Sequence, residues 1–246
     1  MNKVAVVTGS SKGIGAATVA AFAKAGYDVV VNYHSDEKAA NYVATKARKV
    51  GVNALVIKAD VFTEGGVNKL FDAIKGRYKQ IDTLVNNAGL AEEPAFAALN
   101  AAHITEALTA NFTSAVLCTK AAVPLMQVGN ILYCSSVYGL DYGGNPSLPI
   151  YSAAKAAIKN FTQTMAEKLA PNIRCNAVAP GVTKTPAWDT ASSEYIAMRK
   201  GMTLNNEWVR PEEIAATFVF LARTPHINAE TIVVDAGYMK KFPPND

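Results

Sequence analysis

The chain has 246 residues, of which 50% are hydrophobic and 18% are charged, a composition that excludes a globally disordered protein. Its formal net charge is only +4, and its lysines and arginines are scattered, so nothing indicates a nucleic-acid-binding protein. The length suits a single α/β domain with a full-sized core.

Cysteine usage and hydropathy indicate a reducing compartment and no membrane segment. The three cysteines, Cys118, Cys134 and Cys175, form no CxxC pair and are odd in number, which fits no closed disulfide framework. The apolar run at 4–7 is too short for a signal peptide, and the uncharged stretch 121–140 contains Pro, Gln, Gly, Asn and Ser. We therefore expect a cytoplasmic protein.

Short β-branched runs alternate with longer Ala-rich segments along the chain. In chain order the pattern predicts a strand at 4–7, a helix at 14–25, a strand at 28–32, a helix at 35–50, a strand at 54–57, a helix at 64–78, a strand at 83–85, a helix at 101–126, a strand at 131–134, a helix at 150–169, a strand at 173–178, a helix at 211–222 and a strand at 231–234. Such alternation, with uniformly apolar strands, indicates a parallel sheet covered on both faces. The predicted fold is α/β: a doubly wound, seven-stranded Rossmann fold, one domain over 1–246, with 183–210 as a lid.

The first strand-to-helix turn is rich in glycine and reads TGSSKGIG over residues 8–15. Glycines there let the backbone turn sharply and approach a pyrophosphate, and the following helix N-terminus offers free N–H groups. The spacing is neither G-x-G-x-x-G nor the GKS or GKT ending of an ATP- or GTP-binding loop. The turn is predicted to bind a nucleotide.

This turn resembles the TGxxxGxG motif of the short-chain dehydrogenases/reductases, and four further motifs follow in the family's order. Residues 86–89 match its NNAG motif, residues 151–155 its YxxxK motif and residues 180–181 its PG motif, while Ser136 and Asn111 fall where its other two catalytic residues fall. The resemblance covers essentially the whole chain and includes 3-oxoacyl-acyl-carrier-protein reductases. It implies an oxidoreductase that interconverts a carbonyl and an alcohol by hydride transfer without a metal.

Tyr151 and Lys155 carry the predicted acid–base chemistry. They are four positions apart in a predicted helix and therefore share one face. The ordinary pKa of a tyrosine, about 10, is too high for efficient proton exchange near neutral pH, and a nearby ammonium lowers it. We expect Tyr151 to exchange a proton with the substrate oxygen as general acid and base.

The resemblance implies roles for the other members of the set. Lys155 also hydrogen-bonds the nicotinamide ribose, Ser136 polarises the substrate oxygen, and Asn111 holds a water that relays protons. Ser135 competes with Ser136 for its role. Ser136 is preferred because the sequence Ser-x-x-Gly that it starts fits the family pattern better.

The end of the second strand bears on the cofactor. NAD-binding Rossmann proteins usually carry an acid there, which binds the ribose 2′-hydroxyl and would repel a 2′-phosphate. Tyr33 stands at that position, and Lys12 lies where NADP-using family members often carry a basic residue. We therefore predict NADP(H) in preference to NAD(H), with further hydrogen bonds from Asn32, His34 and Ser35.

The remaining cofactor contacts rest on the resemblance. Asp60 and Val61 resemble the family's adenine contact, although Asp60 fits a helix cap equally well. The segment after the PG motif resembles the one that binds the carboxamide. The predicted cofactor site comprises Gly9, Ser11, Lys12, Gly13, Ile14, Gly15, Asn32, Tyr33, His34, Ser35, Asp60, Val61, Asn87, Ala88, Gly89, Tyr151, Lys155, Pro180, Gly181, Val182, Thr183 and Thr185.

The sequence leaves the substrate open. The acyl-carrier reductases dock an acidic carrier through basic residues, but segments 124–129 and 170–172 contain no Lys or Arg, which favours a small ketone, aldehyde, sugar or steroid-like carbonyl. Ser136 and Tyr151 are 15 positions apart, a longer interval than many family members show, so the loop between them is expected to be extended.

Two further expectations concern the lid and the assembly. Trp188, Tyr195, Met198 and Met202 form either an apolar lid or ordinary packing between surface helices. Relatives are usually homo-tetramers or homo-dimers built through the two long helices. Some relatives are catalytically silent NADP-sensing or scaffold proteins, and the intact Asn, Ser, Tyr and Lys set argues against that class.

Overall fold

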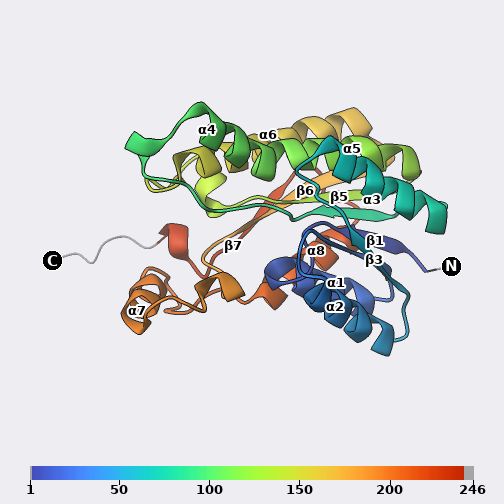
Figure 1. The fold of residues 1–246 in the computed structure, drawn as a ribbon, viewed down its shortest axis with the longest axis horizontal. Helices are drawn as coiled ribbons and strands as arrows, with labels where there is room; N and C mark the ends of the chain where they lie inside the picture. The colour runs from blue at the N-terminus through green and yellow to red at the C-terminus, as the bar shows by residue number, and fades with distance from the viewer. Residues whose placement is uncertain (1, 241–246) are drawn as a thin grey trace.

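Seven parallel strands form one sheet at the centre of the computed structural model, which describes residues 2–240 (Figure 1). Their order across the sheet is β3-β2-β1-β4-β5-β6-β7. The strands are β1 (Val4–Val7), β2 (Asp28–Tyr33), β3 (Ala54–Lys58), β4 (Thr83–Asn86), β5 (Gly129–Cys134), β6 (Ile173–Pro180) and β7 (Thr231–Val234). The predicted doubly wound parallel sheet is confirmed.

Side chains on opposite faces of β1 to β6 enter two separate hydrophobic cores, whereas Val233 on the edge strand β7 is exposed. In β1, Val4 and Val6 pack into one core while Ala5 and Val7 pack into the other. Because both of its faces are buried, β1 is an unbroken apolar run.

Helices cover the two faces of the sheet in two layers (Figure 1). One layer contains α1 (Gly13–Lys24), α2 (Glu37–Lys49) and α8 (Pro211–Arg223). The other contains α3 (Glu64–Arg77), α4 (Ala101–Leu108), α5 (Ser114–Ala122) and α6 (Pro149–Leu169). Among the helices of residues 2–240, none combines the length and apolar character that a bilayer crossing requires.

Two segments differ from the sequence-based expectation. The helix predicted at 101–126 is divided by a π-helical turn at Thr109–Thr113, and its last residues form a 3-10 turn at Val123–Leu125. The segment 183–210 contains a short helix, α7 (Ser193–Gly201), capped by the side chain of Ser192. Local signals for α7 are present, namely the cap at Ser192, Glu194 in the first turn and two basic residues in the last, but the mixed polarity of the segment concealed the helix.

The connections place a crevice beside β1. The chain runs outward from β1 through β2 to β3 and then crosses back to β4, which pairs with the other edge of β1. At such a switch point the loops that follow neighbouring strands leave in opposite directions. The glycine turn follows β1, and the segment 86–89 begins at the last residue of β4, so both motifs lie at the carboxyl edge of the sheet.

Candidate active site

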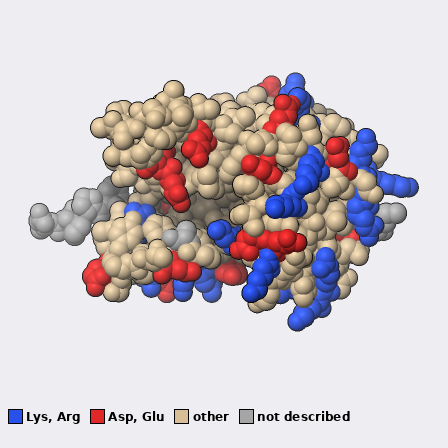
Figure 2. Space-filling model, viewed as in Figure 1, with Lys and Arg blue, Asp and Glu red and all other residues tan. Residues whose placement is uncertain are grey.

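Two adjoining cavities lie at the carboxyl edge of the sheet. A cavity of about 400 Å³ lies over the glycine turn, and a cavity of about 570 Å³ lies over the start of α6. They share Ile14, Asn87, Gly89, Leu90 and Thr185. Figure 2 shows this face hollowed between the layer of α4 and α6 and the part of the molecule that carries α7. Every site residue predicted from the sequence lines one cavity or the other.

The glycine turn and the NNAG segment form one hydrogen-bonded unit. The Thr8 hydroxyl accepts hydrogen bonds from the backbone N–H groups of Asn87 and Ala88, at 3.0 and 3.1 Å. The Asn87 side chain donates in return to the carbonyl oxygens of Thr8 and Gly9. Gly9 has a φ of +60°, and a Cβ there would lie 2.9 Å from Ala88 Cα, so both conformation and space require glycine.

The start of α1 fits a phosphate-bearing group. Helix α1 begins without a capping side chain and without an acidic residue in its first turn, and residues 13–15 line the smaller cavity. Uncapped N–H groups and the positive end of the helix dipole suit an anion. A Cβ on Gly15 would lie 2.5 Å from the Gly9 carbonyl oxygen, so glycine keeps the helix close to the turn.

Asn32, which lines the smaller cavity as predicted, also positions the glycine turn. Its Oδ1 accepts from Gly9 N–H and its Nδ2 donates to the Ala59 carbonyl, both at 3.0 Å. The side chain is 1% exposed. Both of its polar atoms therefore already have backbone partners.

The residues predicted to select the cofactor line the smaller cavity. Lys12, His34 and Ser35 are exposed there, whereas Tyr33 is buried. Asp60 also lines this cavity, with Val61.

The alternative interpretation of Asp60, as a helix cap, is wrong. The cap of α3 is Thr63, whose hydroxyl accepts from Gly66 N–H at 3.0 Å. Asp60 instead accepts a hydrogen bond from the N–H group of Phe62.

Tyr151 and Lys155 lie one turn apart on α6 at the wall of the larger cavity. Lys155 Nζ is 5.4 Å from the centroid of the Tyr151 ring and donates to the Cys134 carbonyl oxygen at 2.9 Å. Lys155 is only 4% exposed, and burial lowers its pKa.

The protonation of Tyr151 differs from the sequence-based argument. Burial raises the pKa of Tyr151 above its ordinary value, and hydrogen bonding with the Ser136 side chain only partly opposes this. The argument considered the charge of Lys155 but not the loss of solvent around the phenol. In the chain alone, the phenol keeps its proton at neutral pH.

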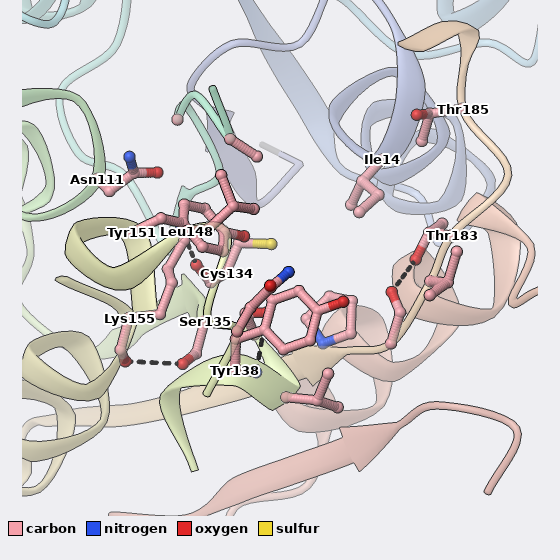
Figure 3. A pocket seen from close by; sticks show the side chains of 18 of the residues that line it. Ile14, Asn111, Cys134, Ser135, Tyr138, Leu148, Tyr151, Lys155, Thr183 and Thr185 are labelled. Atoms are coloured by element: carbon pink, nitrogen blue, oxygen red, sulfur yellow. Dashed lines mark hydrogen bonds between the residues drawn. The ribbon is translucent and has the colours of Figure 1, made fainter. Parts of the chain in front are cut away.

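The two adjacent serines have different partners. The Ser135 hydroxyl donates to the Lys155 carbonyl oxygen at 3.0 Å, a bond that Figure 3 draws, and so holds β5 against α6. The Ser136 hydroxyl accepts from Tyr138 N–H at 3.2 Å and also interacts with Tyr151. Ser136 is therefore the serine available beside the phenol.

Asn111 lies in the π-helical turn at Thr109–Thr113, on the side of the pocket that carries Tyr151 (Figure 3). Its Nδ2 donates to the carbonyl oxygens of Leu90 and Ala107, at 2.7 and 3.0 Å. Its Oδ1 is buried without a partner, and a Cβ on Gly89 would lie 2.6 Å from it. A buried carbonyl oxygen left free in this way is suited to accept a hydrogen bond from a bound water.

The segment 183–210 only partly matches the expected apolar lid. Trp188 and Tyr195 stack at 5.9 Å between ring centroids and line the larger cavity, whereas Met198 and Met202 are exposed and do not. Arg199, a cation, lines the cavity instead.

Several lining residues carry no sequence signal. Tyr138 and Arg199 belong to no motif, and their contact joins residues far apart in the chain. Glu93, which lines neither of these two cavities, also carries no such signal, yet it accepts hydrogen bonds from the first N–H groups of α6. The extended loop contributes Asn145 and Leu148.

The chain is similar to known oxidoreductases over nearly its whole length. A family profile described as enoyl-(acyl carrier protein) reductase matches residues 9–239. The 3-oxoacyl-[acyl-carrier-protein] reductase of Synechocystis sp. is 36% identical, and the match covers 96% of each chain. The cis-4-hydroxycyclohexanecarboxylate dehydrogenase of Sinomonas cyclohexanicum is 35% identical, again over 96% of each.

A solved structure agrees with these sequence matches. L-sorbose reductase from Gluconobacter frateurii, in complex with NADPH and L-sorbose, superposes with a TM-score of 0.91 at 29% identity, covering 98% of each chain. The motifs, the fold and these similarities lead to one conclusion: the chain belongs to the short-chain dehydrogenase/reductase family.

Proposed function

We propose that this protein is an NADP(H)-dependent oxidoreductase that interconverts a carbonyl and an alcohol, with Tyr151 as its proton donor and acceptor. The observation that carries the proposal is the grouping of Tyr151, Ser136 and Lys155 in a cavity that adjoins the one over the glycine turn. Family membership supports the reaction class.

The smaller cavity would hold the dinucleotide. The uncapped start of α1 suits the pyrophosphate, and Thr185, which lines both cavities, lies where the two halves of the cofactor would join. Pro180, Gly181, Val182 and Thr183 line the larger cavity and would receive the nicotinamide end. When bound, the cofactor supplies or accepts the hydride.

The preference for NADP(H) rests on the residues at the end of β2. Tyr33 brings no negative charge to this position, and Lys12, His34 and Ser35 are exposed on the same cavity. An exposed ammonium attracts a 2′-phosphate, whereas a carboxylate there would repel it. The complex of L-sorbose reductase with NADPH supports the same choice by similarity.

The chain's own residues would move the proton. Because burial raises the pKa of Tyr151, the phenol holds its proton at neutral pH and can give it to a carbonyl oxygen during reduction. Ser136 would donate a hydrogen bond to that same oxygen. Lys155, with a water on the free Oδ1 of Asn111, would return a proton to the phenol.

The substrate differs widely among the relatives, whose names mention an acyl carrier, a hydroxycyclohexanecarboxylate and L-sorbose. A 3-oxoacyl-acyl-carrier-protein reductase is the second candidate, favoured by the 36% identity to such an enzyme. Segments 124–129 and 170–172 offer no basic side chain to an acidic carrier, so a small carbonyl compound is preferred.

The proposal also covers the lid segment, the cellular location and the oligomeric state. Residues 183–210 act as a lid, since Trp188 and Tyr195 from this segment border the larger cavity. Free Cys118, Cys134 and Cys175 support a reducing, cytoplasmic location. A homo-tetramer or homo-dimer is expected from the family, and light scattering after size-exclusion chromatography would measure it.

Replacing Tyr151 by phenylalanine tests the central role. We expect Tyr151→Phe to keep NADPH affinity, measured by fluorescence titration, and to lower kcat by at least about 100-fold, the usual contribution of general acid catalysis. Tyr142→Phe, an exposed tyrosine on the loop before α6, is the matched control and should keep wild-type turnover. Unchanged turnover in Tyr151→Phe would exclude the proton-transfer role.

A further inference from the structure

A cation without an acidic partner lines the larger cavity. Of the described side chains that line it, two are cationic, Lys155 and Arg199, and none is Asp or Glu. Lys155 donates to the Cys134 carbonyl and lies against Tyr151, so it belongs to the reacting centre. Arg199 comes from α7 in the lid and has no part in the chemistry proposed above.

Aromatic rings hold the Arg199 guanidinium in place. Its central carbon is 5.9, 6.0 and 5.7 Å from the ring centroids of Trp188, Tyr195 and Tyr238. These three residues, which we name the aromatic cage, attract the cation through their ring faces and limit its side-chain freedom. The guanidinium is therefore oriented in advance.

Part of the hydrogen-bonding capacity of this guanidinium is unused. An arginine has five N–H donors; the Tyr138 hydroxyl accepts from Arg199 at 2.9 Å, and the Tyr238 side chain also hydrogen-bonds it. Its Nε is buried without any partner, and no described carboxylate forms an ion pair with it. Because a half-buried charge with unmet donors is unfavourable, such a site favours an anionic ligand.

Arg199 also lies close to the reacting centre through one intermediate residue. Tyr138, its hydrogen-bond partner, stands in the 3-10 turn Val137–Gly139, and its N–H donates to the Ser136 hydroxyl at 3.2 Å. In Figure 3 the Tyr138 ring extends across the pocket near Ser135. The guanidinium is thus one tyrosine side chain away from the hydroxyl that would hold the substrate oxygen.

We infer that the substrate carries a carboxylate a few bonds from its reacting carbonyl or alcohol, and that Arg199 binds this carboxylate. The substrate class is then oxo acids and the corresponding hydroxy acids. The flat guanidinium matches a carboxylate through two parallel hydrogen bonds, and a singly charged group suits a site with one free cation. This inference rests on the proposed carbonyl–alcohol reaction and adds the anionic group to it.

Matched pairs of substrates test the inference in the wild-type enzyme. Each pair is an oxo acid and its primary amide, with the carbonyl at the second, third, fourth or fifth carbon, and reduction is followed by NADPH absorbance. For at least one chain length we expect kcat/KM for the acid to exceed that for the amide by about 10- to 100-fold, the effect of a hydrogen bond between charged groups. Equal values at every length would overturn the inference.

Variants locate the effect at Arg199. Arg199→Met should lose that preference while its kcat/KM for amides and neutral ketones changes little, and Arg199→Lys should keep part of it. Lys200→Met removes the same charge from the next, exposed residue of α7 and should behave as wild type. An equal loss on acids and neutral ketones in Arg199→Met would show a purely structural role for the arginine and would refute the inference.

Two controls separate the possible failures. If Arg199→Met does not fold, the wild-type enzyme provides the test, with saturated carboxylates and their amides as inhibitors of ketone reduction. Stronger inhibition by the carboxylates supports the inference, and equal inhibition refutes it. If NADPH binds but neither acids nor neutral carbonyls are reduced, the proposed function itself fails. Reduction of neutral ketones alone refutes only the role of Arg199.

Discussion

The first turn of α6, which carries Tyr151, depends on one carboxylate from a distant loop. Pro149 has no N–H group, and Ser152 N–H bonds to the Leu148 carbonyl at 3.0 Å. The remaining two donors, the N–H groups of Ile150 and Tyr151, both bond to the carboxylate of Glu93. Glu93 therefore acts as the cap that the residues before α6 do not supply.

Removing this carboxylate should destabilise the protein and disturb the catalytic residue together. A lost cap lowers the free energy of unfolding by about 0.5–2 kcal/mol, and a lost hydrogen bond to a charged group lowers it by about 1.5–3 kcal/mol. Because water would partly replace the lost bonds, we expect Glu93→Ala to lower the free energy of unfolding by about 2 kcal/mol. That corresponds to a fall in Tm of about 4–8 °C for a chain of this size. Glu93→Gln keeps one acceptor oxygen and should lose about half as much.

Urea unfolding and steady-state kinetics on the same samples measure both effects. We expect kcat to fall by about tenfold in Glu93→Ala because the Tyr151 backbone loses its anchor, while the KM for NADPH changes little. Glu92→Ala, which removes the exposed neighbouring charge, is the control and should resemble the wild type. If Glu93→Ala unfolds at the wild-type urea concentration and keeps full kcat, the capping argument is wrong.

Three further outcomes follow from other contacts. Lys12→Ala should weaken NADPH binding about tenfold without affecting NADH, whereas Lys24→Ala at the far end of α1 should change neither; equal weakening for both nucleotides would contradict a contact with the 2′-phosphate. Gly15→Ala should abolish nucleotide binding in a fluorescence titration, because its Cβ would lie 2.5 Å from the Gly9 carbonyl oxygen; wild-type affinity would disprove the close packing. Burial alone would raise the pKa of Asp28, but hydrogen bonds from neighbouring amides outweigh burial and lower it. Asp28 therefore stabilises the folded protein at pH values above its unfolded pKa, about 3.9, and this contribution is lost as the pH falls through its lower folded pKa. In Asp28→Asn, the free energy of unfolding measured with urea should fall less steeply between neutral and acidic pH than in the wild type. If it falls equally steeply in the two proteins, Asp28 makes no such contribution.

The fold followed from the sequence because its signals are local and repeated. Strands β1 and β2 are buried on both faces, so β1 is apolar throughout and β2 contains three consecutive valines, and the glycine turn marks the first crossover. Helix ends were placed to within a residue or two wherever a glycine, a proline or a capping side chain stood nearby, as at Pro211. The π-helical turn had no such mark, since its distinctive contacts join Asn111 to Leu90 and Ala107.

The parts of the site that escaped prediction depend on contacts between distant residues. Motif spacing brought Ser136, Tyr151 and Lys155 to one place, but the pKa of Tyr151 depends on everything that excludes water from it. Arg199 looks like any exposed helix arginine until the fold brings Tyr138, 61 positions earlier in the chain, to its side. Periodicity and spacing describe neighbours in sequence and contain no information on such pairs.

Asn32 has a practical consequence for engineering. Because its amide hydrogen-bonds Gly9 and Ala59, this residue is part of the scaffold, whereas Tyr33, His34 and Ser35 line the cavity, and His34 and Ser35 are exposed there. Libraries that aim to exchange one dinucleotide for another should therefore vary 33–35 together with residue 12 and leave 32 untouched. The position of the glycine turn would then be preserved while the coenzyme is changed, because residue 32 holds the turn and the other residues would contact the coenzyme.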